Sequence, residues 1–362
     1  MNRDKYMEIE KLSKNNKNII KSMPIKFKII TIIILVIIIA LITITIIRVI
    51  KIEQSKQKYE LYDGTNLNEE KYPGYKELID SLQEKHPSWT FTLFYTKLDW
   101  NDVIKNEGHS DYRTSPLNLI PDYLDYPEDW RCEICGDERY DNGTWLCASD
   151  KAISCQMDPR NILNEDDVFQ FAELKYTDGA QTVEGIMSLT EDSFLEGEST
   201  ANALIQAGKN ANVDSYFITS RLIQEQGRSG TVLSRGYEYN GTIVYNPFNI
   251  HATGNSSDEI LENAAQYAFE QGWNSLEKAL IGGVDFVKED YINIGQNTLY
   301  LQKFDVVKLD GLYSHQYMQN LFAPESEASN MESIYEASGT MDSALNFIIP
   351  LYENMPEEAS ER

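Results

Sequence analysis

The residue best placed to do chemistry is Glu225, near the end of a helix that the sequence predicts over residues 212–227. Ile218, Leu222 and Glu225 fall at positions i, i+4 and i+7, so they share one face of that helix. In a partly apolar cleft, desolvation keeps a carboxyl group protonated near neutral pH, which is the state that a general acid requires. At a helix end in water, the same residue is only a solvated surface group. The pattern alone leaves both interpretations open.

A predicted β-hairpin over residues 229–250 follows this helix and offers a second carboxylate. Two β-type runs flank Asn240-Gly241, the strongest short signal for a tight hairpin turn. The hairpin is expected to bring Glu238 near the mouth of the cleft. A pair of carboxyl groups can protonate a leaving oxygen and activate water, as in glycoside hydrolases. The alternative for Glu238 is an ordinary solvated hairpin residue.

These motifs resemble glycoside hydrolase family 73, the bacterial endo-β-N-acetylglucosaminidases of peptidoglycan. QEQG (224–227) stands where the family has its catalytic Glu, and YNPFNI (245–250) stands where it has a Tyr-Asn-Leu-Phe-Gly-Ile stretch. The wider chain, over residues 72–356, is similar to a clostridial branch of these autolysins. The other matching pieces are YPGYKELI (72–79), HPSWTF (86–91), LDWNDVI (98–104), MDPRNILN (157–164), GQNTLYLQKF (295–304) and HQYMQNLFAPESEA (315–328).

The resemblance implies roles for individual residues. Glu225 matches the catalytic acid, and Tyr291 is the nearest match to a functional tyrosine of the family, although an ordinary core aromatic is the alternative. Glu238, or the 2-acetamido group of the substrate, would complete the displacement. Asn249 replaces the usual Gly and Pro247 the usual Leu, so the backbone there is expected to differ from the family. The residues that match the lining of the sugar cleft are Tyr245, Asn246, Phe248 and Asn249.

Four cysteines lie within 24 residues: Cys132, Cys135, Cys147 and Cys155. RCEICG has the C-x-x-C-G form of a zinc knuckle, and the other two cysteines could complete a tetrahedral site with four thiolates. Such a zinc ion would be structural, because four protein ligands leave no position for water. Two disulfides or free thiols are the alternatives. His109 is a spare candidate ligand, but a surface histidine is the simpler interpretation.

The N-terminal part of the sequence predicts a membrane anchor. Residues 29–47 are 19 residues without a charge, enough to cross the bilayer as a helix. No small-x-small site follows them, so an uncleaved anchor is favoured over a signal peptide. Residues 1–28 hold eight Lys or Arg and are expected to stay in the cytoplasm, as a basic tail. Residues 48–70 are predicted to be a linker to an extracellular body.

The body itself predicts a mainly helical α+β fold. An N-terminal α+β part over residues 71–188 would carry the cysteine loop, and a lysozyme-like glucosaminidase domain over residues 189–356 would have the hairpin beside its cleft. Helices are expected over 256–273 and 274–292, where Gly282-Gly283 allows close backbone approach. Other expectations are a helix in 76–87, a strand over 89–96, a helix in 98–108, a helix beginning near Asn164, an apolar docking segment over 346–356 and a short tail over 357–362.

The charge narrows the possible partners. The net charge of −25 excludes a typical nucleic-acid binder, which needs a basic face. The charge divides into +8 over residues 1–58 and −33 over the rest. The sequence thus predicts a membrane-anchored cell-wall hydrolase that acts on peptidoglycan strands in remodelling or autolysis, with no cofactor for catalysis and an undetermined oligomeric state. A lytic transglycosylase on the same fold and a non-catalytic wall-binding scaffold are the alternatives.

Overall fold

The computed structural model describes residues 58–109, 115–307 and 311–361, with isolated residues between 24 and 43. Residues 57–362 form one compact unit, separate from residues 1–56. The predicted anchor over 29–47, the basic tail and the first part of the predicted linker therefore fall mostly outside the described residues. Within the part that is described, no helix combines the length and the apolar character needed to cross a membrane.

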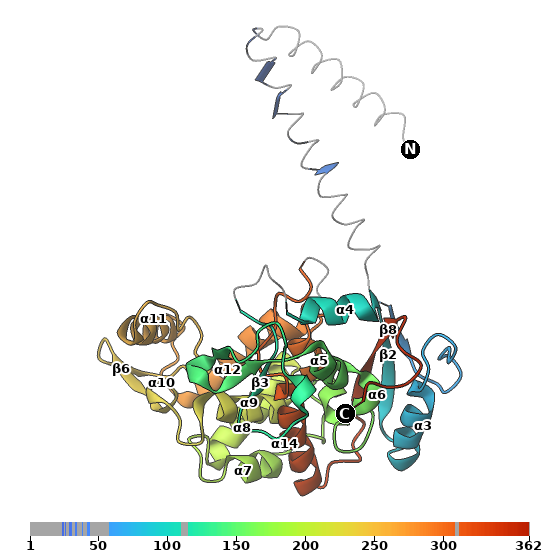
Figure 1. Cartoon of the computed structure of the whole chain (residues 1–362). Coiled ribbons are helices and arrows are strands. Elements are labelled where there is room, and N and C mark those ends of the chain that lie inside the picture. The colour runs from blue at the N-terminus through green and yellow to red at the C-terminus, as the bar shows by residue number, and fades with distance from the viewer. Residues whose placement is uncertain are drawn as a thin grey trace, which may run out of the picture. The chain divides into compact units, whose positions relative to one another are not determined.

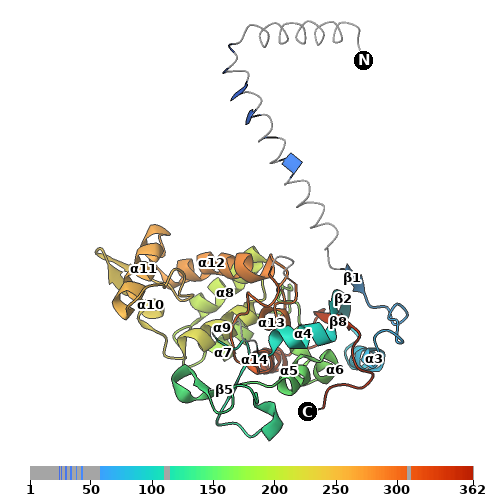
Figure 2. The ribbon, with the colours of Figure 1, turned by 45° about the horizontal axis from the view of Figure 1, so that its top comes forward.

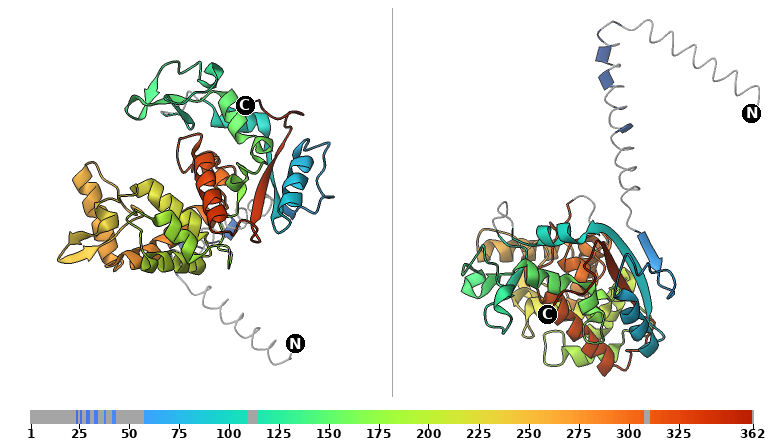
Figure 3. Two further views of the ribbon diagram at one scale, coloured as in Figure 1. Left: turned by 90° about the horizontal axis from the view of Figure 1, so that it is seen from below. Right: turned by 45° about the vertical axis from the view of Figure 1, so that its right-hand side comes forward.

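A three-stranded sheet joins the two ends of the compact unit. Strand β2 (Thr90–Asp99) pairs antiparallel with β1 (Lys58–Leu61) and parallel with β8 (Asn346–Glu353). Helix α3 (Tyr75–Lys85) lies beside β8, where the Tyr75 hydroxyl approaches the carbonyl oxygen of Pro350 (Figure 3). The predicted strand at 89–96 and the helix before it are confirmed, and the apolar segment predicted to dock is strand β8.

Strand β1 corrects the predicted extent of the linker. Residues 48–70 were expected to be a polar tether, but residues 58–61 belong to the sheet. The physical reason is aromatic packing, because the Tyr59 ring stacks on Phe94 of β2 with 4.8 Å between the ring centres. Residues 58–61 thus form an edge strand, which packs one face against the core and exposes polar side chains on the other.

The first half of the unit continues through helix α4 (Trp100–Glu107) to a small antiparallel sheet. Strand β5 (Trp145–Cys147) lies between β3 (Leu119–Pro121) and β4 (Arg139–Tyr140). We call residues 119–147 the cysteine lobe; it projects from the body near the label β5 in Figure 2. Helices α5 (Asp150–Met157) and α6 (Pro159–Ile162) follow it.

The helix predicted to begin near Asn164 does not form there. The side-chain oxygen of Asn164 accepts hydrogen bonds from the backbone N–H groups of Asp166 and Asp167. These bonds make a turn at this point instead of a helix start. A 3-10 turn, Val168–Phe171, follows. This turn lies in the hydrophobic core, where the side chains of Val168, Phe169 and Phe171 are fully buried.

The second half is a bundle of helices with one hairpin. Helices α9, α11 and α12 occupy the stretches that the sequence predicts to be helical, and the hairpin turns at Asn240-Gly241 as expected. Figure 1 shows the hairpin at one end of the body and α3 at the other. The elements are α7 (Val183–Thr190), α8 (Glu198–Ala211), α9 (Ser215–Gln226), α10 (Val232–Arg235), β6 (Tyr237–Tyr239), β7 (Thr242–Val244), α11 (Ser257–Glu270), α12 (Leu276–Val287), α13 (Leu299–Lys303) and α14 (Ala323–Ala337).

The predicted mainly helical α+β class is confirmed. Residues on both sides of position 188 share one hydrophobic core, which runs from Tyr75 and Trp89 to Tyr216 and Tyr335. The C-terminal segment is also fixed, because the buried Arg160 guanidinium donates hydrogen bonds to the carbonyl oxygens of Pro356, Glu357 and Glu358.

Candidate active site

Helix α9 places Glu225 in its last turn. The Asp214 carboxylate caps the helix start by accepting hydrogen bonds from the backbone N–H groups of Tyr216 and Phe217, and Gly227 ends the helix with a φ of 67°. Ile218 and Leu222 are buried, whereas Glu225 is exposed. The shared face predicted from the sequence therefore runs from the core to solvent, with the carboxylate at its outer end.

Glu225 lines a cavity of about 520 Å³. Three of the other residues predicted for the site, Tyr291, Phe248 and Asn249, line the same cavity. They come from the turn after α12 and from the loop after the hairpin, so the fold unites segments far apart in sequence. The remaining lining residues are Arg221, Leu222, Pro247, Ile250, His251, Thr253, Phe286, Val287, Asp290 and Tyr317.

Tyr317 is the direct partner of Glu225. Its hydroxyl group donates a hydrogen bond to Oε1 of Glu225. Burial raises the pKa of the Tyr317 hydroxyl above its usual range; the nearby carboxylates of Glu327 and Glu225 raise it further, and the Arg221 guanidinium opposes them. Tyr317 therefore stays protonated at all physiological pH values and acts as a fixed donor to the carboxyl group.

Arg221 forms the platform beneath Tyr317. The carbon of its guanidinium group lies 3.6 Å from the centre of the Tyr317 ring, within range for a cation–π contact. The buried guanidinium forms an ion pair with Glu327 at 2.7 Å and donates a hydrogen bond to Oε1 of Gln302 at 2.6 Å. The ion pair and the hydrogen bond hold the guanidinium group, and with it the Tyr317 ring, in one orientation.

Tyr291 joins the same aromatic group. It lies in a π-helical turn, Lys288–Ile292, that continues α12, and such turns occur often at functional sites. The Tyr291 ring is nearly perpendicular to Tyr317 at 6.2 Å and lies 4.8 Å from His315. Burial raises the pKa of the Tyr291 hydroxyl, opposed by Arg221. The structure thus brings together Tyr291 and Glu225, as predicted from the resemblance.

The loop after the hairpin divides into a lining part and a supporting part. Phe248 and Asn249 line the cavity, and Asn249 has a φ of 53°, a left-handed conformation that Asn tolerates in place of Gly. Asn246 is fully buried, and its side chain hydrogen-bonds to the backbone of Ile250 and Ala264. Tyr245 packs with the small core beneath the hairpin. Tyr245 and Asn246, predicted to bind substrate, instead support the loop.

Glu238 is not among the residues that line the cavity of Glu225. Strand alternation is the reason, since Tyr239 on one face packs against Phe269 of α11 and Glu238 faces solvent on the other. Glu238 lies opposite Ile243, which is also exposed. Among the described residues of this cavity, the second carboxylate is Asp290, which the sequence analysis did not select.

A second cavity of about 770 Å³ shares the lining residue Tyr317 with the first. Its walls include Trp145, Asp141 and Leu119 of the cysteine lobe, and Gln316 beside Tyr317. We call the two cavities together the groove. The cysteine lobe therefore forms one wall of the groove.

The structure changes the predicted set of metal ligands. Cys132, Cys135 and Cys147 lie together, but the fourth member of the cluster is His109 and not Cys155. Cys155 lies in α5 with its side chain buried in the main core, because that face of the helix packs inward. No disulfide joins the four cysteines, all of which the structure describes.

Several residues of the site were missed by the sequence analysis. Tyr317 lies within the matching piece HQYMQN, and Arg221 lies one helical turn before Glu225, so both had a signal in the sequence. Asp290 directly precedes the predicted Tyr291. His109 is predicted only as a spare ligand, since it lies 23 positions before Cys132. Distance along the chain hid its position in the fold.

Comparison with known proteins gives related hydrolases. No protein-family model matches the chain. A β-N-acetylglucosaminidase of Bacillus subtilis is 30% identical over 196 residues, which are 53% of this chain and 21% of the relative. A bifunctional autolysin of Staphylococcus epidermidis is 26% identical over 220 residues, 58% of this chain and 16% of the relative. The chain thus spans only about a fifth of the length of these curated relatives.

Solved structures share the fold. The structure of S. aureus glucosaminidase B has a TM-score of 0.54 and 21% identity, covering 75% of this chain and 97% of that one. The structure of a major bifunctional autolysin has a TM-score of 0.51 and 21% identity, covering 73% and 98%. The predicted resemblance is therefore confirmed: the chain is a relative of bacterial β-N-acetylglucosaminidases and autolysins and has the mainly helical α+β fold of their solved structures.

Proposed function

We propose that the chain is a peptidoglycan hydrolase that cleaves the β-1,4 bond between N-acetylglucosamine and N-acetylmuramic acid. The observation that carries the proposal is the carboxyl group of Glu225, at the edge of a cavity with a tyrosine hydroxyl donating to it. The similarity to glucosaminidases and autolysins supports this choice of substrate and bond.

Glu225 donates a proton to the leaving glycosidic oxygen. Because the Tyr317 hydroxyl already donates to Oε1, Oε2 is the oxygen that carries the proton toward the substrate. The faces of Phe248 and Tyr291, both in the cavity, provide apolar surface for the sugar ring. Arg221 and Gln226 position this machinery: Arg221 lies under Tyr317, and the Gln226 side chain donates to the carbonyl oxygen of Pro247 at 2.7 Å.

The second catalytic group is proposed to be the substrate's own 2-acetamido group. This choice rests on the position of Glu238, whose carboxylate is outside the residues that line the cavity. Asp290, which does line it, would hold the acetamido group or the attacking water. The same observation favours a second candidate function, a lytic transglycosylase, because that reaction needs only one carboxyl group. A wall-binding scaffold without activity is the remaining alternative.

Mass spectrometry of the fragments released from purified peptidoglycan tests the proposal. The full chain should release fragments with reducible N-acetylglucosamine ends, and Glu225→Gln should lower the rate by about 10²–10⁴-fold. Glu238→Gln is the matched control and should change the rate less than about twofold. Anhydromuramyl ends would identify the transglycosylase. Intact strands with wild type, or full activity of Glu225→Gln, would contradict the assignment of Glu225.

A membrane anchor is the proposed means of keeping the enzyme at the wall. The support is the uncharged stretch over residues 29–47 and the eight basic residues before it, which favour a single pass with the N-terminus in the cytoplasm. The acidic body would then be extracellular. Alkaline extraction should leave the full chain with the membrane pellet, and protease added to intact protoplasts should remove the body. Complete release by alkali would refute the anchor.

A further inference from the structure

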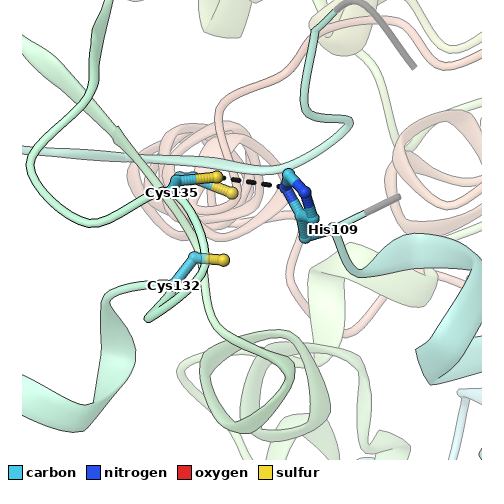
Figure 4. Close-up of side chains that lie close together, drawn as sticks. His109, Cys132 and Cys135 are labelled. Carbon is cyan, nitrogen blue, oxygen red and sulfur yellow. Dashed lines mark hydrogen bonds between the residues drawn. The ribbon is translucent and has the colours of Figure 1, made fainter. Parts of the chain in front are cut away.

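The cysteine cluster has the composition and compactness of a metal site. The ligand atoms of His109, Cys132, Cys135 and Cys147 all lie within 4.8 Å of one another. Nδ1 of His109 is 3.1 Å from Sγ of Cys135, and the Cys132 side chain points toward the same region (Figure 4). In a tetrahedral zinc site with bonds of about 2.3 Å, two sulfur ligands are about 3.8 Å apart. The cluster therefore needs shifts of no more than about 1 Å to close on an ion.

The backbone around the cluster holds the sulfur atoms in place. The amide of Cys132 donates to the carbonyl oxygen of Cys147 at 2.9 Å, which ties the C-x-x-C turn to β5. The turn closes with hydrogen bonds from the amides of Gly136 and Glu138 to Cys132 and Cys135, and Gly136 has a φ of 57°. Both cysteines of the turn thus face the third, which lies in a strand. Cys132 and Cys147 are buried, so their thiols do not face bulk water.

The cluster also connects two separate segments of the unit. His109 follows the end of α4, whereas the three cysteines belong to the cysteine lobe. The outer part of the lobe has little core of its own, since Tyr123 and Ile134 are about three-quarters exposed. An ion bound by all four residues would fasten this lobe to α4.

We propose that His109, Cys132, Cys135 and Cys147 bind one structural Zn²⁺ ion, which fixes the cysteine lobe as a wall of the groove. Three thiolates and one imidazole form a complete tetrahedral set, and Zn²⁺ is the ion that this set prefers. With four protein ligands the ion has no position for water, so it takes no part in catalysis.

The zinc site lies between two segments that border the groove. Leu119, Asp141 and Trp145 of the lobe line the groove, and Cys147 lies two residues after Trp145 in the same strand. On the other side, Glu107 accepts hydrogen bonds from Gln316, a residue of the groove next to Tyr317. The zinc ion therefore sets the spacing between the lobe wall and the segment that carries Tyr317. This effect on cleavage rests on the proposed function, whereas zinc binding does not.

Metal content tests the binding directly. The purified full chain should contain about one zinc ion per molecule by plasma mass spectrometry. Cys132→Ser and Cys147→Ser should each lose most of it, and Cys155→Ala, the matched control at the cysteine outside the cluster, should keep it. Because a serine variant can fail to fold, His109→Cys provides a second measurement: it changes the ligand set to four thiolates and should retain the ion. Loss of zinc with Cys155→Ala, or its retention in both serine variants, would refute this ligand set.

Cobalt spectroscopy distinguishes the site from a disulfide. Replacement of zinc by Co²⁺ should give the intense visible bands of a tetrahedral thiolate site, and these should change with His109→Cys. A chain without zinc whose mass shows the loss of two hydrogens would prove a disulfide and overturn the proposal. A chain with neither metal nor disulfide would overturn it as well.

Proteolysis tests the role in the lobe. Removal of zinc by a chelator should increase cleavage within residues 122–144 while the helical part stays resistant. If zinc binds but chelation leaves the lobe protected, the clamp is refuted although the metal site stands. If the lobe loosens and fragment release from peptidoglycan is unchanged, the groove role is refuted. If no variant releases fragments, the failure lies with the proposed function and not with the zinc site.

Discussion

The role proposed for Glu225 depends on residues that hold its side chain in place. The carboxylate is exposed, so solvent alone would leave its orientation free. Tyr317 fixes one oxygen by donating to it, and Arg221 fixes Tyr317 through the ring contact and its ion pair with Glu327. The buried ion pair of Arg221 and Glu327 thus holds the Tyr317 ring, and Tyr317 in turn holds the carboxyl group of Glu225.

Substitution of Tyr317 by Phe should separate the hydroxyl group from the ring. The ring would stay over Arg221, but the hydrogen bond to Glu225 would be lost. We expect kcat to fall about 10-fold to 100-fold with little change in KM, since a hydrogen bond to a charged group contributes about 1.5–3 kcal/mol. Steady-state kinetics on peptidoglycan fragments would measure this.

The control is Tyr239→Phe, which removes a hydroxyl group from the hairpin, outside the cavity. Equal losses in the two variants would mean that Tyr317 acts only through stability. An unchanged kcat in Tyr317→Phe would show that Glu225 needs no such donor.

At the level of elements, the approach of α12 to the loop after the hairpin shapes the cavity. A Cβ atom added at Gly283 would overlap the ring of Phe248. The predicted close approach at Gly282-Gly283 is thus confirmed, with Gly282 against the Trp273 ring in the same way. Two glycines allow the helix to lie against two aromatic rings, and one of those rings lines the cavity.

Gly283→Ala should push Phe248 away from its position. We expect a loss of about 1–3 kcal/mol in the free energy of unfolding from overpacking, together with an increased KM. Urea unfolding and kinetics would measure the two effects. Asp285→Ala, at an exposed position of the same helix, is the control and should be neutral. If Gly283→Ala and Asp285→Ala give the same stability and KM, helix α12 accommodates the added methyl group without displacing Phe248, and the prediction is wrong.

The cap of α9 predicts a dependence of stability on pH. Burial raises the pKa of Asp214 to about 6, although Tyr335, the amides of Phe217 and Tyr216, and Gln181 donate to it and oppose the shift. The ordinary value of 3.8 applies to the unfolded chain. Between these values the unfolded chain releases its proton before the folded one does. The stability that Asp214 contributes is thus complete below about pH 4 and lost as the pH rises through about 6.

Asp214→Asn removes this titration. Relative to wild type, the free energy of unfolding of the variant should rise by up to about 3 kcal/mol between pH 4 and pH 7, and then stay constant. Urea unfolding at several pH values would measure the difference. Asp178→Asn, at an exposed aspartate, should show no such trend. A difference that does not vary with pH in Asp214→Asn would refute the raised pKa.

Local signals explain which elements could be predicted. The predicted helix start at Ser256, the turn at Asn240-Gly241 and the predicted helix end at Gly227 are each decided by neighbours in sequence, and all three are confirmed. Glu238 was misplaced because strand alternation shows two faces but not which one meets the cleft. The place of His109 beside the three cysteines depends on contacts across a long stretch of chain, which a single sequence does not display.

At the scale of the whole molecule, strand β8 completes the core. Phe347, Ile349 and Tyr352 of β8 are fully buried, and Ile349 is opposite Leu93 in the register with β2. The helical half and the sheet share one continuous hydrophobic core. We therefore expect the two halves to unfold together.

Ile349→Ala tests this coupling. The cavity it leaves should cost about 2–5 kcal/mol in the free energy of unfolding, and the transition should stay single whether it is followed by far-ultraviolet dichroism or by tryptophan fluorescence. The control, Ile243→Ala on the exposed face of the hairpin, should cost less than about 0.5 kcal/mol. Two separate transitions would instead indicate that the halves are independent.

The pairing of β8 with β2 has a consequence for how the protein is made. Thr96 in β2 bonds to the carbonyl oxygen of Leu351, 255 residues later. During synthesis from the N-terminus, β2 has to wait for nearly the entire remaining chain before its parallel neighbour emerges. Pairing over such a separation is intrinsically slow. The hydrolase proposed above would therefore stay incomplete until strand β8 has been synthesised, which delays its activity until the end of translation.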